Sequence, residues 1–501
     1  MPEVSIKHRK IKNLIKKYEN IWALSYFLNL ANWDTETYMP EQGTIVRGEA
    51  CARLNLLIQK EVLNPEFIKL VKETSAEQDL TASERGIIRI LTKQIDTYQK
   101  LPKEFLEAYT TLITSSSLIW AKAKRANDFS IFSDVLERIF TLSRQKAEYL
   151  GYKDHPYDAL LDEYEQDITV KDLDKFFTEI KNFLTENFSE EIAKNKGKLA
   201  TFTQEAYDQE AMARLNLKVL QYFGANPQNL RLDKSSHPFT ATISTKDVRI
   251  TTRYPQTGFT GSLLSTVHEF GHALYTLQHA ALIEKTPLFT INSLGLHESQ
   301  SRFWENHVGK SAGFIKTFYT DFLSLGKNFK KYSWQDFYQN FNFISPSLIR
   351  TEADEVTYNY HILIRYEVEK ALLSGTIKVK DLVEFWNDKY QKYLGIIPKN
   401  LSEGVLQDIH WSCGLIGYFP SYALGTVLSA TWQKQLVLDL QTDLNSLINS
   451  QTGINKIKAW QKEKIHQYGY TYTLEELVKK VTAKNFSTID WQGYLQKKYL
   501  Y

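Results

Sequence analysis

The chain has 501 residues, of which 43% are hydrophobic and 24% charged, a composition typical of an ordinary folded protein with a large core. Its 61 basic and 58 acidic residues leave a net charge of +3, so charge gives no reason to expect binding to nucleic acid or to an anionic membrane. Only two cysteines occur, Cys51 and Cys413, which excludes a disulfide framework and fits a reducing compartment.

The N-terminal segment combines apolar residues at helical spacing with a basic cluster, His8-Arg9-Lys10 followed by Lys12, Lys16 and Lys17. We interpret this cluster as the solvated face of a first helix rather than as a nucleic-acid-binding arm. The segment lacks the apolar stretch of a signal peptide, and no run of about 18 apolar residues occurs in the chain. We therefore expect a cytoplasmic protein without a membrane span.

Most of the chain is predicted to be helical, because Leu, Ile and aromatic residues recur every three or four positions with Lys, Glu and Gln between them. Residues 105–126 and 132–151 are examples, and Gly151 suits the position after the second helix, since glycine tolerates a left-handed backbone. No repeat or linker marks a domain boundary. We predict a single, mostly α-helical catalytic domain over residues 1–501.

Residues 237–254 depart from the helical pattern. Thr, Ile and Val dominate this stretch and alternate as in strands, and residues 244–247 interrupt the alternation. The pattern predicts a small antiparallel β-sheet of two short strands joined by a turn.

The next segment, residues 261–280, is predicted to form one helix and contains the sequence HEFGH at 268–272. His268 and His272 lie about one turn apart on the same face, a spacing at which two imidazoles can bind one Zn²⁺. Glu269 is offset from both, so it can take a proton from a metal-activated water and deliver it to a leaving amine. The segment therefore predicts a hydrolytic metal site.

A catalytic zinc needs a third protein ligand and an open fourth position. Residues 293–309 are predicted to form a second helix, which carries His297 and Glu298. The spacer from His272 is long enough to turn the chain and bring this helix alongside the first. We choose Glu298 as the third ligand, because a carboxylate usually follows this motif after a long spacer, and His297 is the competing ligand.

Residues 404–425 place Gln, Asp, His, Trp and two Tyr among apolar residues, and polar groups at such density are costly to bury without a role. A hydrolytic site needs donors for the developing oxyanion. We assign this role to His410 first, then Tyr422, then Tyr418. Cys413 is interpreted as a packed residue, since no partner base is evident.

Five motifs along the chain, with Trp33-Asp34, Met39-Pro40 and Arg47 before them, resemble the carboxypeptidase Taq family of metallopeptidases. The motifs are DVRIT at 247–251, HEFGH at 268–272, HESQ at 297–300, IRTEAD at 349–354 and GVLQDIHW at 404–411. The resemblance is strongest from 237 to 425, and residues of about 60–230 are not aligned. Thr276 stands where the family pattern leads us to expect an acidic residue.

The resemblance implies one mostly helical fold, with two helical halves flanking a deep active-site groove and the small sheet along one wall. It implies that His268, His272 and Glu298 bind one divalent metal ion, usually Zn²⁺ with Co²⁺ as the alternative, and that Glu269 is the base. It also implies a homodimer that removes single residues from the C-termini of peptides with broad side-chain tolerance, while C-terminal proline is disfavoured.

A carboxypeptidase must bind the free carboxylate of its substrate, and the planar, always-charged Arg side chain suits this task. Arg350 and Arg249 are the candidates, and we assign Gln407 and Asp408 to substrate binding with them. Each arginine also has a structural interpretation as half of an ion pair. The partners considered are Glu352, Asp354 or Glu355 for Arg350, and Asp247 for Arg249.

Four further residues of suitable type are interpreted as structural: Arg302, Arg365, His279 and His307. The predicted sheet could bind the main chain of an extended peptide at its edge, which would explain broad specificity. Two other functions share parts of the pattern. A thimet-type oligopeptidase has the same HExxH and distal Glu but lacks the HESQ and GxxQDxHW segments, and a non-catalytic peptide-binding or metal-storing protein would not need Glu269.

Overall fold

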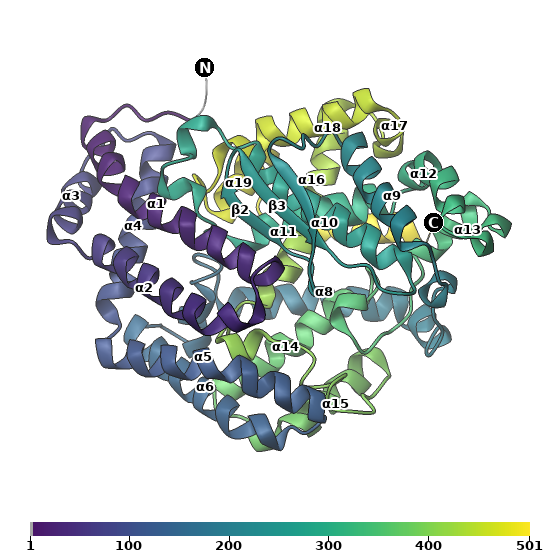
Figure 1. Cartoon of the computed structure of the whole chain (residues 1–501), viewed down its shortest axis with the longest axis horizontal. Helices are drawn as coiled ribbons and strands as arrows, with labels where there is room; N and C mark the ends of the chain where they lie inside the picture. The colour runs from purple at the N-terminus through teal and green to yellow at the C-terminus, as the bar shows by residue number, and fades with distance from the viewer. Residues whose placement is uncertain (1–3, 501) are drawn as a thin grey trace.

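The computed structural model describes residues 4–500, and most of them lie in helices joined by short loops (Figure 1). The helices before the sheet are α1 (Arg9–Thr37), α2 (Thr44–Val62), α3 (Pro65–Ser75), α4 (Ala82–Lys100), α5 (Lys103–Ala126), α6 (Ser130–Leu150), α7 (Pro156–Leu161), α8 (Val170–Lys194) and α9 (Gln209–Tyr222). Those after it are α10 (Phe259–Leu277), α11 (Leu294–Arg302), the π-helix η5 (Phe303–Gly309), α12 (Ala312–Ser324), α13 (Trp334–Phe341), α14 (Tyr358–Leu373), α15 (Leu382–Leu394), α16 (Pro420–Leu440), α17 (Leu444–Ile448), α18 (Gln451–Lys464), α19 (Leu474–Thr482) and α20 (Ile489–Tyr499). The predicted mostly α-helical fold is confirmed.

The apolar periodicity of the sequence correctly predicted the positions of several helices. In α1 the side chains of Ile11, Leu14 and Tyr18 are buried while Lys12 and Lys16 are exposed, so the basic cluster is the solvated face of an amphipathic helix. Helices α5 and α6 occupy the two segments chosen as examples, and α6 ends at Gly151, whose φ is +85°. None of the helices in residues 4–500 is long and apolar enough to cross a membrane.

Buried apolar side chains of the described residues form two clusters, and these divide the helices into two halves. The first core draws on α1–α4, α9–α13, α17–α19 and the sheet, and the second draws on α5–α8, α14, α15 and α20. In Figure 1 the helices α5, α6, α14 and α15 lie at the bottom of the view, and α17 and α18 lie at the top. The two helical halves implied by the family resemblance are therefore present.

Helix α16 belongs to both halves. Its Leu428 and Trp432 lie in the first core, whereas Leu424 and Val427 lie in the second. Residues 423–432 of α16 are buried on every side of the helix, whereas its last turns carry exposed residues such as Lys434 and Leu438. Because α16 packs between the two cores and against α11, it fixes the position of α11 within the molecule.

The sheet contains β1 (Leu230–Lys234), β2 (Thr240–Ser244) and β3 (Asp247–Thr252) in the order β1-β3-β2. Strands β2 and β3 form the predicted antiparallel hairpin, with Thr240 opposite Ile250. Strand β1 runs parallel to β3 on its other side, so the sheet is mixed, which corrects the prediction of a purely antiparallel sheet. The prediction missed β1 because three of its five residues, Arg231, Asp233 and Lys234, are charged, and because it lies outside the stretch rich in Thr, Ile and Val.

Candidate active site

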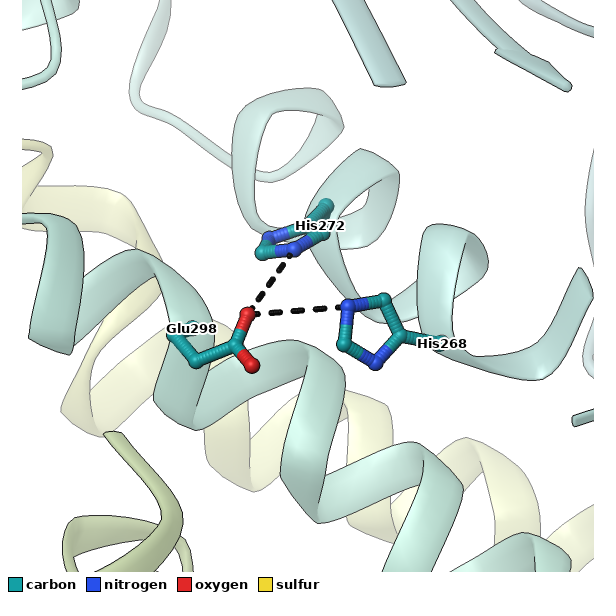
Figure 2. A group of neighbouring side chains, drawn as sticks. All are labelled: His268, His272 and Glu298. Atoms are coloured by element: carbon teal, nitrogen blue, oxygen red, sulfur yellow. Dashed lines mark ion pairs between the residues drawn. The ribbon is translucent and has the colours of Figure 1, made fainter. Parts of the chain in front are cut away.

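Two neighbouring helices bring the predicted metal ligands together. Helix α10 carries His268 and His272, and α11 carries Glu298. The Nε2 atoms of the two histidines lie 3.5 and 3.4 Å from the same oxygen, Oε2 of Glu298 (Figure 2). Ligand atoms of all three residues lie within 4.8 Å of one another, and two imidazoles with one carboxylate are a donor set typical of a catalytic zinc site.

The close approach of α10 and α11 depends on the glycine of the HEFGH segment. A Cβ atom added to Gly271 would lie 2.5 Å from the carbonyl oxygen of Gln300 and 2.6 Å from Cα of Ser301. Both are backbone atoms of α11 that cannot move aside separately. A side chain at this position would therefore push the two helices apart, and with them the histidines from Glu298.

The side chains around this group orient its members. Nδ1 of His268 lies 2.8 Å from Oε2 of Glu305, which leaves Nε2 of His268 directed at Glu298. Oε1 of Glu298 accepts a hydrogen bond of 2.7 Å from Nε of Arg302. Burial opposes ionisation of Glu298, but Arg302 and the two histidines outweigh burial and hold the pKa of this carboxyl well below its usual value. Glu298 is thus held in the ionised state that binds a cation.

His297, the competing ligand, has a different environment. Its ring stacks on that of His272, with 4.2 Å between ring centroids and 26° between ring planes. Burial lowers the pKa of His297 well below its usual value, so the side chain is neutral. A neutral imidazole can bind a metal, so the choice between the two residues rests on position: the ligand atoms of Glu298 and the two histidines of α10 lie within 4.8 Å of one another, and His297 is not part of this group.

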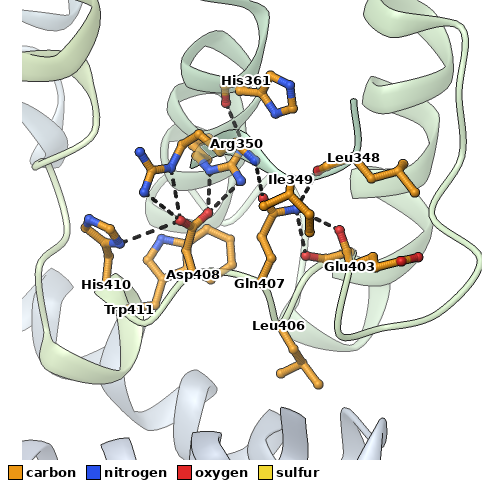
Figure 3. A network of polar contacts seen from close by, with 12 residues as sticks. Leu348, Ile349, Arg350, His361, Glu403, Leu406, Gln407, Asp408, His410 and Trp411 are labelled. Atoms are coloured by element: carbon orange, nitrogen blue, oxygen red, sulfur yellow. Dashed lines mark hydrogen bonds and ion pairs between the residues drawn. The ribbon is translucent and has the colours of Figure 1, made fainter. Parts of the chain in front are cut away.

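A second polar cluster forms around Asp408 (Figure 3). Nε of Arg350 donates to Oδ1 of Asp408 over 3.0 Å, and Nε of Arg365 donates to Oδ2 over 2.7 Å. Burial opposes the charge of Asp408, but the two guanidinium groups hold its pKa far below the usual value. The amide oxygen of Gln407 accepts a hydrogen bond of 3.0 Å from the backbone N–H of Arg350.

The ion-pair partner of Arg350 is Asp408. It is not one of the three acidic residues considered from the sequence, Glu352, Asp354 and Glu355. Of these, Glu355 pairs instead with Lys498 of α20 at 2.7 Å, and Asp354 accepts hydrogen bonds from Thr357. The alternative interpretation of Arg350 as half of an ion pair named three partners close in sequence, whereas the observed partner lies in the next motif.

His410, Tyr418 and Tyr422 lie together beside Arg350. Nε2 of His410 is 3.1 Å from the hydroxyl of Tyr422, and the rings of Tyr418 and Tyr422 have centroids 5.3 Å apart. The guanidinium carbon of Arg350 lies 4.8 Å from the centroid of the Tyr422 ring. Burial lowers the pKa of His410 to about 3, so the imidazole is neutral near pH 7. Burial also raises the pKa of Tyr418 to about 12.

Comparison with known proteins identifies the family of this chain. The model of the carboxypeptidase Taq (M32) metallopeptidase family matches residues 11–499. The chain belongs to this family. It is 40% identical to thermostable carboxypeptidase 1 of Pyrococcus furiosus over 100% of both chains, and 35% identical to carboxypeptidase 1 of Bacillus subtilis over 99% of both.

Solved structures agree with this assignment. A Pyrococcus furiosus carboxypeptidase structure superposes with a TM-score of 0.95 at 40% identity and covers 99% of both chains. The M32 carboxypeptidase of Deinococcus radiodurans superposes with a TM-score of 0.92 at 29% identity and covers 98% of this chain and 99% of its own. This M32 protein is accordingly a metallocarboxypeptidase, a peptide hydrolase with a mostly helical fold.

Tyr358 connects the two clusters of this carboxypeptidase, and none of the sequence motifs includes it. The guanidinium carbon of Arg302 lies 4.1 Å from the centroid of the Tyr358 ring, and the Tyr358 hydroxyl accepts a hydrogen bond of 3.3 Å from Nη1 of Arg350. Arg302 also binds Glu298. The predicted metal ligands on α10 and α11 are therefore continuous with the cluster around Arg350. Tyr358 lies four residues beyond the IRTEAD segment, which was the only available signal.

Arg249 lies elsewhere. Its guanidinium group forms hydrogen bonds of 2.9 and 2.8 Å to Asp247 and stacks on Trp33 of α1 at 4.2 Å. Successive side chains of a strand point to opposite faces. The hydroxyl of Thr252 in β3 donates a hydrogen bond to the carbonyl oxygen of Ser262 in α10. Arg249 lies three positions before Thr252, so its side chain points to the opposite face of the sheet. The structure thus brings Arg350 to the site and keeps Arg249 apart from it.

Other residues interpreted as structural have structural partners. Arg302 pairs with Glu305 as well as Glu298, and Arg365 is fully buried against Asp408. His307 is buried, with Nε2 3.1 Å from the hydroxyl of Ser429. Glu305, the partner of His268, was not predicted, because its only signal is its place two turns beyond Glu298 on the continuing helix.

Proposed function

We propose that this enzyme hydrolyses the C-terminal peptide bond of short or unfolded peptides and releases single amino acids, with broad side-chain tolerance and poor action on C-terminal proline. The observation that carries the proposal is the continuity of the two clusters through Tyr358. The predicted metal ligands His268, His272 and Glu298 adjoin Arg350, a buried arginine that is suited to binding a carboxylate. An exopeptidase that acts at the C-terminus requires both features.

His268, His272 and Glu298 would hold one divalent ion, with Zn²⁺ as the first choice and Co²⁺ as the alternative. The residues fit such an ion: the two Nε2 atoms face one carboxylate oxygen, and Glu305 engages Nδ1 of His268 and so leaves its Nε2 free to bind. When bound, the ion supplies Lewis acidity, which acidifies water and polarises the scissile carbonyl.

Glu269 is the proposed general base and acid. It lies on α10 between the two histidines and is buried, with 6% of its surface exposed. In hydrolysis its carboxylate takes a proton from the attacking water and passes it to the leaving amine. The hydroxyl of Thr240 donates a hydrogen bond of 2.6 Å to Oε2 of Glu269, which supports one defined orientation of this carboxylate.

His410, Tyr422 and Tyr418 are the proposed donors to the oxyanion. The pKa of about 3 keeps the His410 imidazole neutral, and burial raises the pKa of Tyr422 well above its usual value, so both groups are in states that donate hydrogen bonds. Their mutual hydrogen bond at 3.1 Å fixes one relative to the other.

Arg350 is the proposed site for the substrate carboxylate. Gln407 and Asp408, which we assign to substrate binding with it, would act by holding its backbone N–H and its guanidinium group. A buried guanidinium that is already oriented loses little entropy on binding a second carboxylate. Arg249 is the weaker candidate, because Asp247 already occupies its guanidinium on the far face of the sheet.

The outer edge of β2 is the proposed site for the substrate main chain. The backbone of Phe239 pairs with Thr251 of β3, so the backbone groups of Thr240, one residue on, face away from β3. A peptide paired at this edge would be held by its main chain, which leaves its side chains loosely selected.

One experiment separates this function from that of an oligopeptidase. The metal-loaded enzyme is incubated with an N-blocked dipeptide as free acid, the same dipeptide as C-terminal amide, and an internally quenched peptide blocked at its C-terminus. We expect release of the C-terminal amino acid from the free acid alone. Comparable cleavage of the amide or of the quenched peptide would overturn the proposal.

The assigned base has its own test. We expect Glu269→Gln to lower kcat by about 100- to 10 000-fold, because the variant cannot accept the water's proton. The metal content, measured by mass spectrometry of the dialysed protein, should stay near that of the wild type, since Glu269 is not one of the three ligands. Wild-type kcat in this variant would show that another group is the base.

A further inference from the structure

Thr240 of β2 contacts the proposed base directly. Its hydroxyl lies 2.6 Å from Oε2 of Glu269 and 3.2 Å from the backbone carbonyl oxygen of the same residue. A hydroxyl has a single proton to donate, and 2.6 Å is the separation expected for an O–H donor and an ionised carboxylate. The carboxylate is therefore the main acceptor, and the carbonyl is a second acceptor within reach.

This contact joins two separate elements. Glu269 belongs to α10, whereas Thr240 belongs to the edge strand of the sheet that lies on α10. A Glu side chain has several rotatable bonds, and its rotamers are restricted only by what surrounds it. Because Thr240 engages Oε2, the other oxygen of Glu269 remains available for the reacting water.

The backbone of Thr240 faces the proposed substrate. Since Phe239 pairs with β3, the N–H and C=O groups of Thr240 point to the outer edge of β2. Farther along the same edge, the carbonyl oxygen of Thr242 accepts a hydrogen bond of 3.2 Å from Asn29 of α1. The main chain of Thr240 can thus pair with a peptide at this edge, while its side chain contacts Glu269 on α10. The distance between a bound peptide and the Glu269 carboxylate is then set through a single residue.

We infer that Thr240 is a positioning residue that fixes the Glu269 carboxylate relative to a peptide paired along β2, an inference that rests on the proposed role of Glu269. Thr242 provides the comparison within the same strand. It lies on the same face of β2, and its hydroxyl is 3.4 Å from that of Thr276 on α10, so it packs against the helix without contacting Glu269.

The test compares Thr240→Val, Thr240→Ser and Thr242→Val with the wild type on an N-blocked dipeptide. Valine keeps the β-branched shape and removes the hydroxyl, whereas serine keeps the hydroxyl. We expect Thr240→Val to lower kcat by about 10- to 100-fold, the range typical of lost partners of active-site groups, with KM changed less than about twofold. Thr240→Ser should keep kcat within about threefold of the wild type, and Thr242→Val should match the wild type.

Metal content and thermal midpoint are measured on every variant, and we expect both to stay near the wild-type values. Wild-type kcat in Thr240→Val, an equal loss in Thr242→Val, or an equal loss in Thr240→Ser would overturn the inference. Glu269→Gln distinguishes an error in the proposed base from an error in the role of Thr240. An active Glu269→Gln would overturn the base and the role of Thr240 together, whereas an inactive one beside a fully active Thr240→Val would overturn the role of Thr240 alone.

Discussion

Among single residues, two carboxylates of the site, Glu298 and Asp408, keep their charge because each faces a guanidinium group. Arg302 pairs with Glu298, and both Arg350 and Arg365 pair with Asp408. Removing one member of a buried ion pair is strongly destabilising, since the remaining charge is left without a partner. Asp408 is the clearest case, because two buried cations depend on it.

We therefore expect Asp408→Asn to destabilise the protein by about 3–5 kcal/mol, the range for a broken buried ion pair. The same change frees Arg350 from its fixed position, so KM for free-acid dipeptides should rise at least about tenfold, the effect of losing about 1.4 kcal/mol of binding. Chemical unfolding and steady-state kinetics measure the two effects. Asp388→Asn, at an exposed position of α15, should change neither, and an Asp408→Asn variant of wild-type stability and KM would contradict the expectation.

Buried histidines predict how stability depends on pH. Burial lowers the pKa of both His279 and His307 to about 3, whereas the unfolded value is near 6.5. Between these values the unfolded chain binds more protons than the folded one, so stability rises with pH across this window and is lost as pH falls. Each histidine should contribute a loss of about 2 kcal/mol between pH 7 and pH 5.

His307→Gln tests this dependence, because glutamine does not titrate. The variant is expected to be less stable than the wild type at pH 7, through lost packing, and the difference should narrow at pH 5. Denaturant unfolding at both pH values and equal ionic strength measures it. A stability gap that stays constant or widens on acidification would contradict the assignment of a neutral buried His307.

At the scale of helices, the site depends on how closely α11 approaches its neighbours. Gly271 of α10 allows the approach on one side. On the other side, a Cβ atom at Gly425 of α16 would lie 2.6 Å from Cβ of Glu298. Helix α11 is thus held between two glycine contacts, and its position fixes the carboxylate of Glu298.

Gly271→Ala is expected to separate α10 from α11 and lower metal affinity by about 10- to 100-fold, with a loss of about 1–3 kcal/mol in stability from overpacking. Chelator competition and thermal unfolding measure the two effects. Gly261→Ala on the same helix is the matched control. Its added Cβ would meet nothing within 4 Å, so it should keep the metal affinity and leave stability equal or slightly higher. Wild-type metal affinity in Gly271→Ala would show that the glycine does not set the ligand distances.

At the scale of the whole molecule, the site lies where the two halves meet. The predicted metal ligands lie on helices of the first core, while Tyr358 and the residues around Arg350 adjoin the second. Helix α16 joins the cores and carries Tyr422, one of the proposed oxyanion donors. The relative position of the two halves therefore decides whether the cluster proposed to bind the substrate carboxylate reaches the proposed metal ligands.

We also propose that the enzyme is a homodimer that associates through α2. Ile45, Val46, Leu56 and Leu57 of this helix are 76%, 68%, 54% and 44% exposed, and a spacing of eleven residues, about three turns, puts the two pairs on one face. Light scattering should give twice the chain mass of 58.2 kDa for the wild type. The double variant Ile45→Glu, Val46→Glu should give the mass of a monomer. A monomeric wild type, or a double variant that stays dimeric, would contradict this interface.

Local periodicity and short motifs were enough to predict part of the fold and of the site. The mostly helical fold, the β2–β3 hairpin and the face shared by His268 and His272 all follow from side-chain spacing along one segment, because the backbone geometry of a helix or strand is fixed locally. Glu298 was also predicted from sequence, since its motif adjoins a helical pattern and follows a spacer of suitable length.

Which groups distant in sequence come into contact depends on tertiary packing. Asp408 is the partner of Arg350 although three acidic residues lie nearer in sequence, Arg249 points away from α10, and Thr240 reaches Glu269. These contacts join segments whose spacing along the chain does not specify their distance in space. They arise from the packing of two cores around α16, and packing depends on the shapes of all the elements together.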